Sequence, residues 1–193
     1  GPGMTYTMFK NGEAQAGGMM EVTKEMGPVP SHWLTYFAVA NCDDTFARGT
    51  GMGAKVTVPP KDIPNVGRFA ILQDPQGAMF VAFKPQKMAE PPASPELGDF
   101  SWHELATTDD GAGCMFYEAL FGWKRTRTMD LGEMGPYHLF SASEHQCGGI
   151  YRKPPEMPGP SSWLYYVRVR DVDAAAKHCQ KLHGKVLNGP IEV

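Results

Sequence analysis

The sequence lacks a long apolar segment and a strong excess of charge of either sign. Its longest apolar stretches, such as residues 78–83, are far shorter than the roughly 20 residues that span a bilayer. The chain does not open on a charged segment followed by an apolar one, the pattern of a signal peptide. The 18 Lys and Arg residues nearly balance the 21 Asp and Glu residues and form no long basic run. We therefore expect neither a membrane nor a nucleic acid among its partners.

Cysteine is also scarce: the four residues are scattered and form no Cys-x-x-Cys pair. Without a secretory context, this spacing favours reduced thiols in a cytoplasmic protein over disulfides. Cys114 or Cys147 could instead act as a nucleophile. Neither lies in a sequence signature of a catalytic cysteine, however, and small buried thiols are common.

What the sequence does contain is a long internal repeat. Tyr-x-x-Phe at 6–9, followed seven residues later by Gly-Gly, returns at 137–140 with the same spacing. Trp-Leu at 33–34 likewise returns at 163–164, so the offset is 130 or 131 positions. Solenoid repeats have periods of roughly 20 to 50 residues, so this longer repeat indicates duplicated domains.

A proline-rich segment separates the two copies. Residues 85–99 contain four prolines and few large apolar residues, which disfavours a helix or a central strand. We therefore predict a first module at 1–84, a linker at 85–99 and a second module at 100–193.

Each module is predicted to contain units of one strand, one helix and three strands. In the second module, residues 102–107 have the pattern of a strand, and Asp109 can cap a helix that ends at Gly122. Strands are also expected at 6–9, 17–22, 33–39, 69–72, 78–83, 123–129, 137–141, 148–152 and 163–169, and helices near 43–52 and after Asp171. This mixture predicts an α+β fold of tandem βαβββ units with curved mixed sheets.

Both ends of the chain read as incomplete units. The first unit has only its last two strands, and the last unit stops at Val193 before its later strands. An unpaired edge strand can pair with another chain, so a homodimer or strand exchange is one expectation. The alternative is that the sequence is a fragment whose module stays open.

Three motifs together resemble the vicinal oxygen chelate superfamily, which contains glyoxalases, bleomycin-resistance proteins and extradiol dioxygenases. They are Trp-His-Glu-Leu-Ala-Thr-Thr-Asp at 102–109, Phe-Tyr-Glu-Ala-Leu-Phe-Gly-Trp at 116–123 and Asp-Pro-Gln-Gly-Ala-Met-Phe at 74–80. The resemblance implies paired βαβββ units around a concave cavity. In metal-dependent members, His and Glu side chains hold a divalent ion there.

At the positions where the resemblance implies metal ligands, this chain has other residues. The histidine position is occupied by Trp102, Leu164 or Leu34 in the different units, and the glutamate position by Val81. A metal site needs about three or four ligands that converge. His103 lies one residue beyond the ligand position, so strand alternation points it to the opposite face. We expect no metal and no other cofactor.

Several side chains are predicted to line the cavity. Glu104 shares the parity of Trp102, so it could act as a general acid or base or accept a hydrogen bond from a ligand. A structural role, pairing with an arginine such as Arg168, is the alternative. The predicted substrate-binding residues are Trp102, Glu104, Tyr166, Arg168, Leu34, Tyr36 and Val81, whose aromatic members favour a flat or hydrophobic molecule.

The sequence thus favours a metal-free protein that binds a small hydrophobic or aromatic molecule. The alternative is a lyase or oxygenase of the glyoxalase, dioxygenase or hydroxylase kind, which would use Glu104 as the catalytic residue or metal ligands from outside this sequence. A purely structural role, in which the modules only supply an interface, is a third hypothesis.

Overall fold

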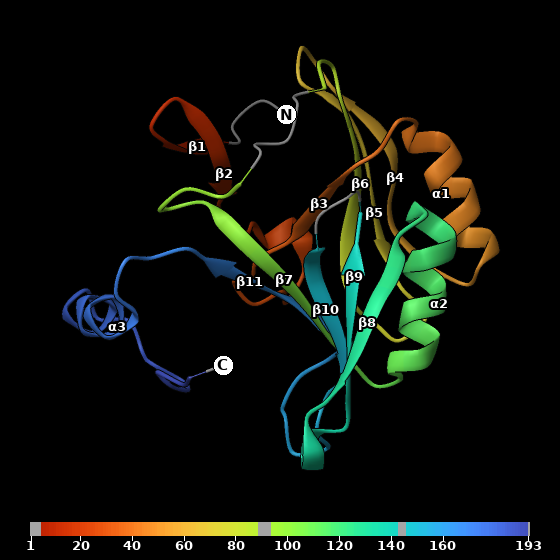
Figure 1. Ribbon diagram of the computed structural model, residues 1–193. Coiled ribbons are helices and arrows are strands. Elements are labelled where there is room, and N and C mark those ends of the chain that lie inside the picture. The colour runs from red at the N-terminus through yellow and green to blue at the C-terminus, as the bar shows by residue number, and fades with distance from the viewer. Residues whose placement is uncertain (1–4, 89–93, 143–145, 193) are drawn as a thin grey trace. The chain divides into compact units, whose positions relative to one another are not determined.

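The computed structural model describes residues 5–88, 94–142 and 146–192; residues 89–93 of the predicted linker lie outside the described residues. Figure 1 shows the elements along the chain. In chain order they are β1 (Tyr6–Asn11), β2 (Ala14–Met20), η1 (Lys24–Met26), β3 (Thr35–Ala38), α1 (Cys42–Gly51), β4 (Lys55–Ile63), β5 (Gly67–Gln73), β6 (Met79–Pro85), β7 (Phe100–Thr107), α2 (Asp110–Phe121), β8 (Lys124–Asp130), η2 (Gly132–Met134), β9 (Pro136–Ser141), β10 (Gln146–Arg152), β11 (Ser162–Val167) and α3 (Val172–Lys181).

Within the part of the chain that the structure describes, the strands form three sheets. The first sheet has the order β3-β6-β5-β4, the second has the order β11-β7-β10-β9-β8, and β1 pairs with β2. In each large sheet the first and last strands of a βαβββ unit are parallel, and the remaining pairs within the unit are antiparallel. The predicted α+β class of tandem βαβββ units is therefore confirmed.

Contacts between Cα atoms divide the chain into two compact units. The larger unit contains residues 22–91 and 102–165, and the smaller one contains residues 1–21, 92–101 and 166–193. The larger unit thus combines the complete βαβββ unit before the proline-rich segment with the complete one after it. The module boundaries derived from the sequence repeat stay a prediction.

Local capping explains why the helices begin and end where they do. The Asp109 side chain accepts a hydrogen bond from Ala112 N at 3.1 Å, and Gly122 ends α2 in the left-handed conformation, as predicted. Asn41 caps α1 by accepting from two backbone N–H groups. Gly49 inside α1 allows close packing, because a Cβ there would lie 3.3 Å from Leu72 Cδ1.

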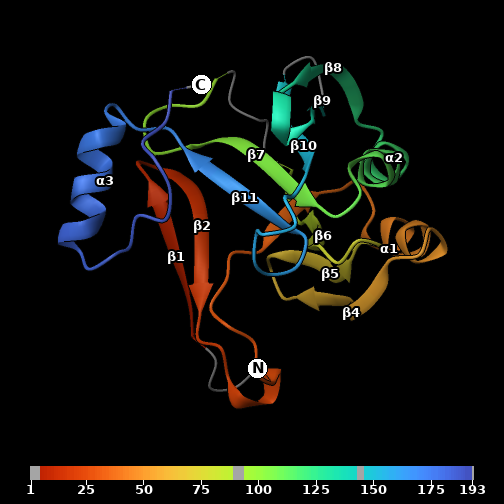
Figure 2. The ribbon, with the colours of Figure 1, turned by 90° about the horizontal axis from the view of Figure 1, so that it is seen from below.

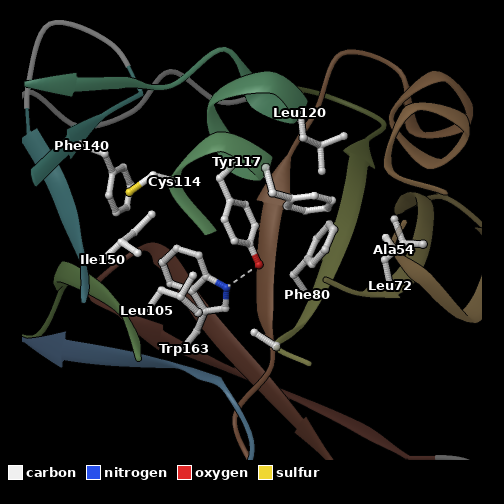
Figure 3. Packing of buried hydrophobic residues seen from close by; sticks show 12 residues of the cluster. Ala54, Leu72, Phe80, Leu105, Cys114, Tyr117, Leu120, Phe140, Ile150 and Trp163 are labelled. Atoms are coloured by element: carbon white, nitrogen blue, oxygen red, sulfur yellow. Dashed lines mark hydrogen bonds between the residues drawn. The ribbon is translucent and has the colours of Figure 1, made fainter. Parts of the chain in front are cut away.

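The two large sheets turn their helix-covered faces toward one core within the larger unit. Leu72 of the first sheet and Leu105 of the second are buried in the same cluster as Tyr117 of α2 (Figure 3). Phe37 of β3 also packs edge-on against Trp163 of β11, with ring centroids 5.3 Å apart. The helices α1 and α2 lie side by side (Figure 2). The opposite face of each sheet, called its outer face below, therefore points away from that core.

Strand β4 is the element that the sequence patterns missed. It contains Pro59 and Pro60, which cannot donate ladder hydrogen bonds, and its pairing with β5 shifts register between Val56 and Val58 and again before Lys61. The sheet tolerates these prolines because β4 is an edge strand.

The internal repeat is visible in how strands pair. In the β1–β2 pair, Tyr6 is opposite Met20 and Phe9 is opposite Gly17. The equivalent residues of the β9–β10 pair are opposite each other in the same way: Tyr137 and Tyr151, and Phe140 and Gly148. In both strand pairs the pairing register also shifts at the equivalent position. The duplicated sequence therefore forms the same local structure in each copy.

Within the described residues, every helix is too short or too polar to cross a membrane.

Candidate functional site

The candidate site lies on the outer face of the second sheet. Strand alternation decides which side chains of β7 appear there. Leu105 and Thr107 pack next to Gly113 of α2, so they belong to the helix-covered face. Trp102 and Glu104 therefore project together from the outer face; that they line a binding cavity stays a prediction.

Tyr137 of β9 joins these two residues through hydrogen bonds. Trp102 Nε1 donates to Tyr137 Oη at 2.8 Å, and Tyr137 Oη donates to Glu104 Oε1 at 2.5 Å. An indole N–H can only donate and an ionised carboxylate can only accept, so the direction of this chain is set. Tyr137 thereby holds the Glu104 carboxylate in one position.

Gly149 of β10 allows Tyr137 to reach β7. The β10 strand lies between β9 and β7, and Gly149 pairs with Glu104 on one side and Leu139 on the other. A Cβ at Gly149 would lie only 2.1 Å from Tyr137 Cζ. The tyrosine ring therefore lies across the strand in the space that a side chain would fill.

Tyr151 extends this aromatic surface. Its ring centroid is 6.1 Å from that of Tyr137, with an angle of 25° between the ring planes. Burial and the nearby negative charge of Glu104 raise the pKa of the Tyr151 phenol. Three aromatic rings and one carboxylate thus share the outer face; we call Trp102, Glu104, Tyr137 and Tyr151 the outer-face cluster.

Other predicted site residues lie on the first sheet. Tyr36 pairs with Val81, and its ring meets Phe83 edge-on at 5.8 Å. Both Tyr36 and Val81 belong to the outer face of the first sheet, because the alternate residues Phe80 and Ala82 are in the cores next to the helices. Leu34 directly precedes β3. The structure therefore does not place Leu34, Tyr36 and Val81 on the same sheet face as Trp102 and Glu104.

Tyr166 and Arg168 belong to the smaller unit. Arg168 Nη1 donates to Pro95 O at 2.8 Å, and the Tyr166 carbonyl accepts a hydrogen bond from Ser101 Oγ at 3.4 Å. The bidentate pairing of Glu104 with Arg168 stays a prediction.

His103 and His138 lie on the helix-covered face. A ring nitrogen of His103 is 3.1 Å from Cys147 O, and burial lowers the His103 pKa. His138 is hydrogen-bonded to Thr128 Oγ1 and to Asp110 Oδ2, both at 3.0 Å. Both histidine side chains thus belong to the helix-covered face of the sheet and not to the outer face.

Asp110 anchors the start of α2 to the second sheet. Besides His138, Arg152 donates to it, from Nε to Oδ1 at 2.8 Å. Burial alone would raise the pKa of Asp110, but the hydrogen bonds from His138 and Arg152 bring it below its ordinary value. Local sequence patterns do not reveal this network, because its members are distant along the chain.

The donor set on the outer face does not suit a metal ion. Among residues 5–88, 94–142 and 146–192, no three His, Cys, Asp or Glu side chains form a group that could hold one. Glu104 supplies one carboxylate, whereas a catalytic divalent site takes about three protein ligands. The absence of metal from the working protein stays a prediction.

A cavity of about 10 Å³ lies on the helix-covered face of the second sheet. Its walls include Cys114, Tyr117, Trp123 and His138. This volume is at the lower limit for a single water molecule, so the cavity cannot hold an organic ligand.

The thiols of buried Cys114 and partly buried Cys147 are poor nucleophiles. Burial raises the pKa of Cys114 to about 11 and also raises that of Cys147. The thiolate is the reactive form, so little of either side chain is reactive at neutral pH.

The sequence as a whole matches one family model. The model of the Glyoxalase/Bleomycin resistance protein/Dioxygenase superfamily matches residues 1–82 and 100–192. The chain belongs to this superfamily. The match covers both sides of the proline-rich segment, so the superfamily sequence pattern occurs twice, as the internal repeat requires.

Two curated proteins are similar to this superfamily member. "Putative glyoxylase CFP32" of Mycobacterium bovis is 49% identical over 83 residues, which cover 43% of this chain and 31% of that protein. Anthracycline biosynthesis protein DauV of Streptomyces sp. (strain C5) is 29% identical over 168 residues, which cover 85% of this chain and 59% of DauV. The chain thus spans less than two thirds of either relative.

A solved structure supports the superfamily fold. The structure of BphC, a halotolerant catechol dioxygenase, matches with a TM-score of 0.52 and 16% identity, over 77% of this chain and 55% of BphC. At this identity the likeness shows the fold alone.

Proposed function

We propose that this protein binds a small aromatic or hydrophobic molecule at the outer-face cluster, without a metal ion. The single observation that carries the proposal is the Trp102–Tyr137–Glu104 hydrogen-bond chain. It fixes a carboxylate beside two aromatic rings on a sheet face that the helices do not cover. Binding sites for small molecules combine apolar surface with a few fixed polar groups.

The name of one relative supports this class of ligand. DauV is named for anthracycline biosynthesis, and anthracyclines are flat aromatic molecules. Flat rings stack or meet edge-to-face with tryptophan and tyrosine, at about 0.5–1.5 kcal/mol beyond the burial of area. We propose the same class of ligand, and not one particular compound, for this chain.

Removing the tyrosine hydroxyl should weaken ligand binding. We expect Tyr137→Phe to lower affinity for aromatic ligands about three- to tenfold, because Glu104 and the Trp102 N–H lose the hydrogen-bond partner that orients them. Isothermal titration against a panel of aromatic compounds measures this. Tyr36→Phe, on the outer face of the first sheet, is the matched control and should bind normally. Equal losses in both variants would contradict the assignment of the site.

Purified protein should contain far less than one metal ion per chain. The reason is that Trp102 and Val81 occupy positions at which the superfamily resemblance implies ligands. Elemental analysis after purification without chelators checks this expectation. Stoichiometric Zn, Ni, Fe or Mn would contradict it.

A second candidate function is supported by the 2.5 Å contact between Tyr137 Oη and Glu104 Oε1. A carboxylate paired with a phenol can move a proton, so the same cluster could serve a lyase or oxygenase with Glu104 as general acid or base. A screen of hemithioacetals, catechols and small epoxides with added divalent metals separates the two. Turnover that Glu104→Gln abolishes would favour the enzyme.

The cellular setting and the assembly are also proposals. Four free cysteines support a cytoplasmic protein. A homodimer or strand exchange is supported by apolar side chains of the smaller unit such as Leu182, which is 68% exposed after α3. Light scattering that gave a strict monomer at high concentration would exclude the dimer.

A further inference from the structure

Helix α3 repeats helix α1 position by position. The two helices, Val172–Lys181 and Cys42–Gly51, have 10 residues each and lie 130 positions apart, which is the offset of the internal repeat. Their N-caps, Asp171 and Asn41, have the same offset. The side chains of α3 can therefore be compared one by one with those of α1.

One face of α1 is covered by a pair of strands. Cys42, Thr45 and Gly49 are its buried residues. The helix packs on β5 and β6, the last two strands of its βαβββ unit (Figure 2). Cys42 Sγ lies 3.5 Å from Ala82 O of β6, and a Cβ at Gly49 would lie 3.3 Å from Leu72 of β5. These positions of the helix therefore form its packing face.

The equivalent positions of α3 are apolar but exposed to solvent. They are Val172, Ala175 and Cys179, and Leu182 continues the stripe at the C-cap. Helix α3 buries none of its residues, all of which the structure describes; Val172 is 55% exposed and Leu182 is 68% exposed. Although β1 and β2 belong to the same smaller unit, they leave this face exposed. The face therefore has the composition of a packing face but is not buried within its own chain.

The β1–β2 pair has the matching surface. At the offset of the repeat, β1 and β2 correspond to β9 and β10, the last two strands of their unit. Ile150 of β10 is buried against α2, where a Cβ at Gly113 would lie 3.7 Å from it. The residue of β2 at the position of Ile150 is Met19, which is 63% exposed. The β1–β2 pair thus presents an exposed methionine at the position that faces a helix in β9–β10.

Strand pairing shows which residues of the two surfaces correspond. Ala82 pairs with Phe37 and Ile150 pairs with Leu105, and both partners lie four residues before the N-cap of their helix. Ala82 and Ile150 therefore occupy equivalent positions in their units. Met19 is at this position in β2, so it is the residue that the first turn of a covering helix would contact.

From these two surfaces we infer that the chain forms a homodimer in which α3 of each copy packs on the β1–β2 pair of the other copy. Val172 then lies against Met19, as Cys42 lies against Ala82. The exchange is reciprocal, so the same contact occurs twice about a two-fold axis and the assembly is closed. This inference rests on the proposed homodimer and names the surfaces that form it.

The exposed area of the chain is large enough for this interface. The chain exposes 13383 Å² of accessible surface. A folded monomer of 21.2 kDa is expected to expose roughly 9,000 Å². The surplus exceeds the roughly 800 Å² that each partner contributes to a standard protein interface. Docking of a second copy therefore has apolar surface to bury.

Neighbouring alanines of α3 provide a matched pair of variants. Ala175→Glu places a charge at the position of buried Thr45, whereas Ala174→Glu places it at the position of exposed Asp44. We expect Ala175→Glu to raise the dimer dissociation constant about tenfold or more, because the charge is buried without a partner, and Ala174→Glu to change it less than about twofold. Sedimentation equilibrium of the full chain measures both constants, and thermal melts check that the variants fold.

A crosslink identifies what covers the face of α3. Val172→Cys and Met19→Cys are combined in a Cys179→Ser background and treated with a short bis-maleimide. We expect a covalent dimer on a denaturing gel, and only background crosslinking when either new cysteine is present alone. Intact mass distinguishes a link between two chains from a link within one chain.

Each contrary outcome overturns the inference in a different way. A link within one chain would mean that α3 is covered by the β1–β2 pair of its own chain. A dimer that gives no crosslink here and tolerates Ala175→Glu uses another surface, and the proposed homodimer then stands without this interface. A strict monomer at high concentration ends both the inference and the proposed homodimer.

Discussion

Replacing Asp74 by alanine should lower the free energy of unfolding of the larger unit by about 3–5 kcal/mol. Asp74 is buried in the turn before β6, where its Oδ1 accepts from Gln76 N at 2.9 Å and from Ala78 N at 2.8 Å. Its Oδ2 accepts from Tyr117 Oη at 2.9 Å. Alanine leaves these three donors without the carboxylate, and the tyrosine is fully buried. Urea denaturation followed by circular dichroism measures the loss.

The asparagine variant distinguishes the contribution of the hydrogen bonds within the turn from that of the hydrogen bond to Tyr117 of α2. Asp74→Asn keeps an oxygen for the two backbone donors but places an N–H₂ group opposite Tyr117 Oη. That oxygen already accepts from Trp163 Nε1 at 3.2 Å (Figure 3). The tyrosine proton then loses its acceptor, so we expect an intermediate loss of about 1–3 kcal/mol. Equal stability of the alanine variant and the wild type would show that the network does not hold the two βαβββ units together.

The stability of the wild type should also depend on the protonation of Asp74. Burial raises the pKa of Asp74 above its ordinary value, despite the hydrogen bonds that it accepts. A carboxyl whose pKa is raised by folding contributes most below its unfolded pKa of about 3.9, and the contribution is lost as pH rises through the folded pKa. The difference in stability between wild type and Asp74→Asn should therefore shrink as pH rises from the unfolded pKa of Asp74 through its folded pKa. Unfolding curves at several pH values test this sign.

This network explains two of the motifs that carried the superfamily resemblance. The Asp-Pro-Gln-Gly turn at 74–77 and the Phe-Tyr motif at 116–117 are separate local signals in the sequence, one for a turn and one for a helix. In the structure they meet, because Tyr117 donates to Asp74. The sequence therefore predicts the elements from local capping and turn chemistry, but the contact between them depends on how two βαβββ units pack.

The same distinction applies to the candidate site. The shared parity of Trp102 and Glu104 follows from strand alternation, so the sequence places both on one face. Tyr137 could not be assigned from alternation within one strand, because it reaches β7 across β10. The sequence feature that could have identified Tyr137 is the internal repeat. Tyr6 lies over Gly18 as Tyr137 lies over Gly149, and a Cβ at Gly18 would lie 2.3 Å from Tyr6 Cε1.

The grouping of the Tyr36 and Trp102 residues, which stays a prediction, could not be derived from the sequence for a different reason. Parity tells which face of its own sheet a residue occupies, but not where two sheets lie relative to each other. Here Phe37 and Trp163 pack together in the common core, so the helix-covered faces converge. Tyr36 and Trp102, on the alternate positions, are therefore directed away from each other.

Replacing Gly149 by alanine should separate Tyr137 from Glu104 and lower ligand affinity about tenfold or more. The added methyl group would lie 2.1 Å from Tyr137 Cζ and 2.2 Å from its hydroxyl oxygen, so the ring must move away. Its hydrogen bonds to Trp102 and Glu104 then break, with a loss of stability of about 1–3 kcal/mol. Calorimetric titration and a thermal melt measure the two effects.

The control for this prediction is a glycine-to-alanine substitution at a position where the added methyl group makes no close contact. Gly111→Ala in the first turn of α2 meets Asp109 Oδ1 at 3.6 Å, an ordinary contact, and should leave binding unchanged and stability equal or slightly higher. In a Tyr137→Phe background, Gly149→Ala should weaken binding less than it does in the wild type, because the hydrogen bonds are already absent. Unchanged affinity in the single variant Gly149→Ala would mean that the ligand does not depend on the position of Tyr137. The carboxylate of Glu104 would then have to be held by other contacts.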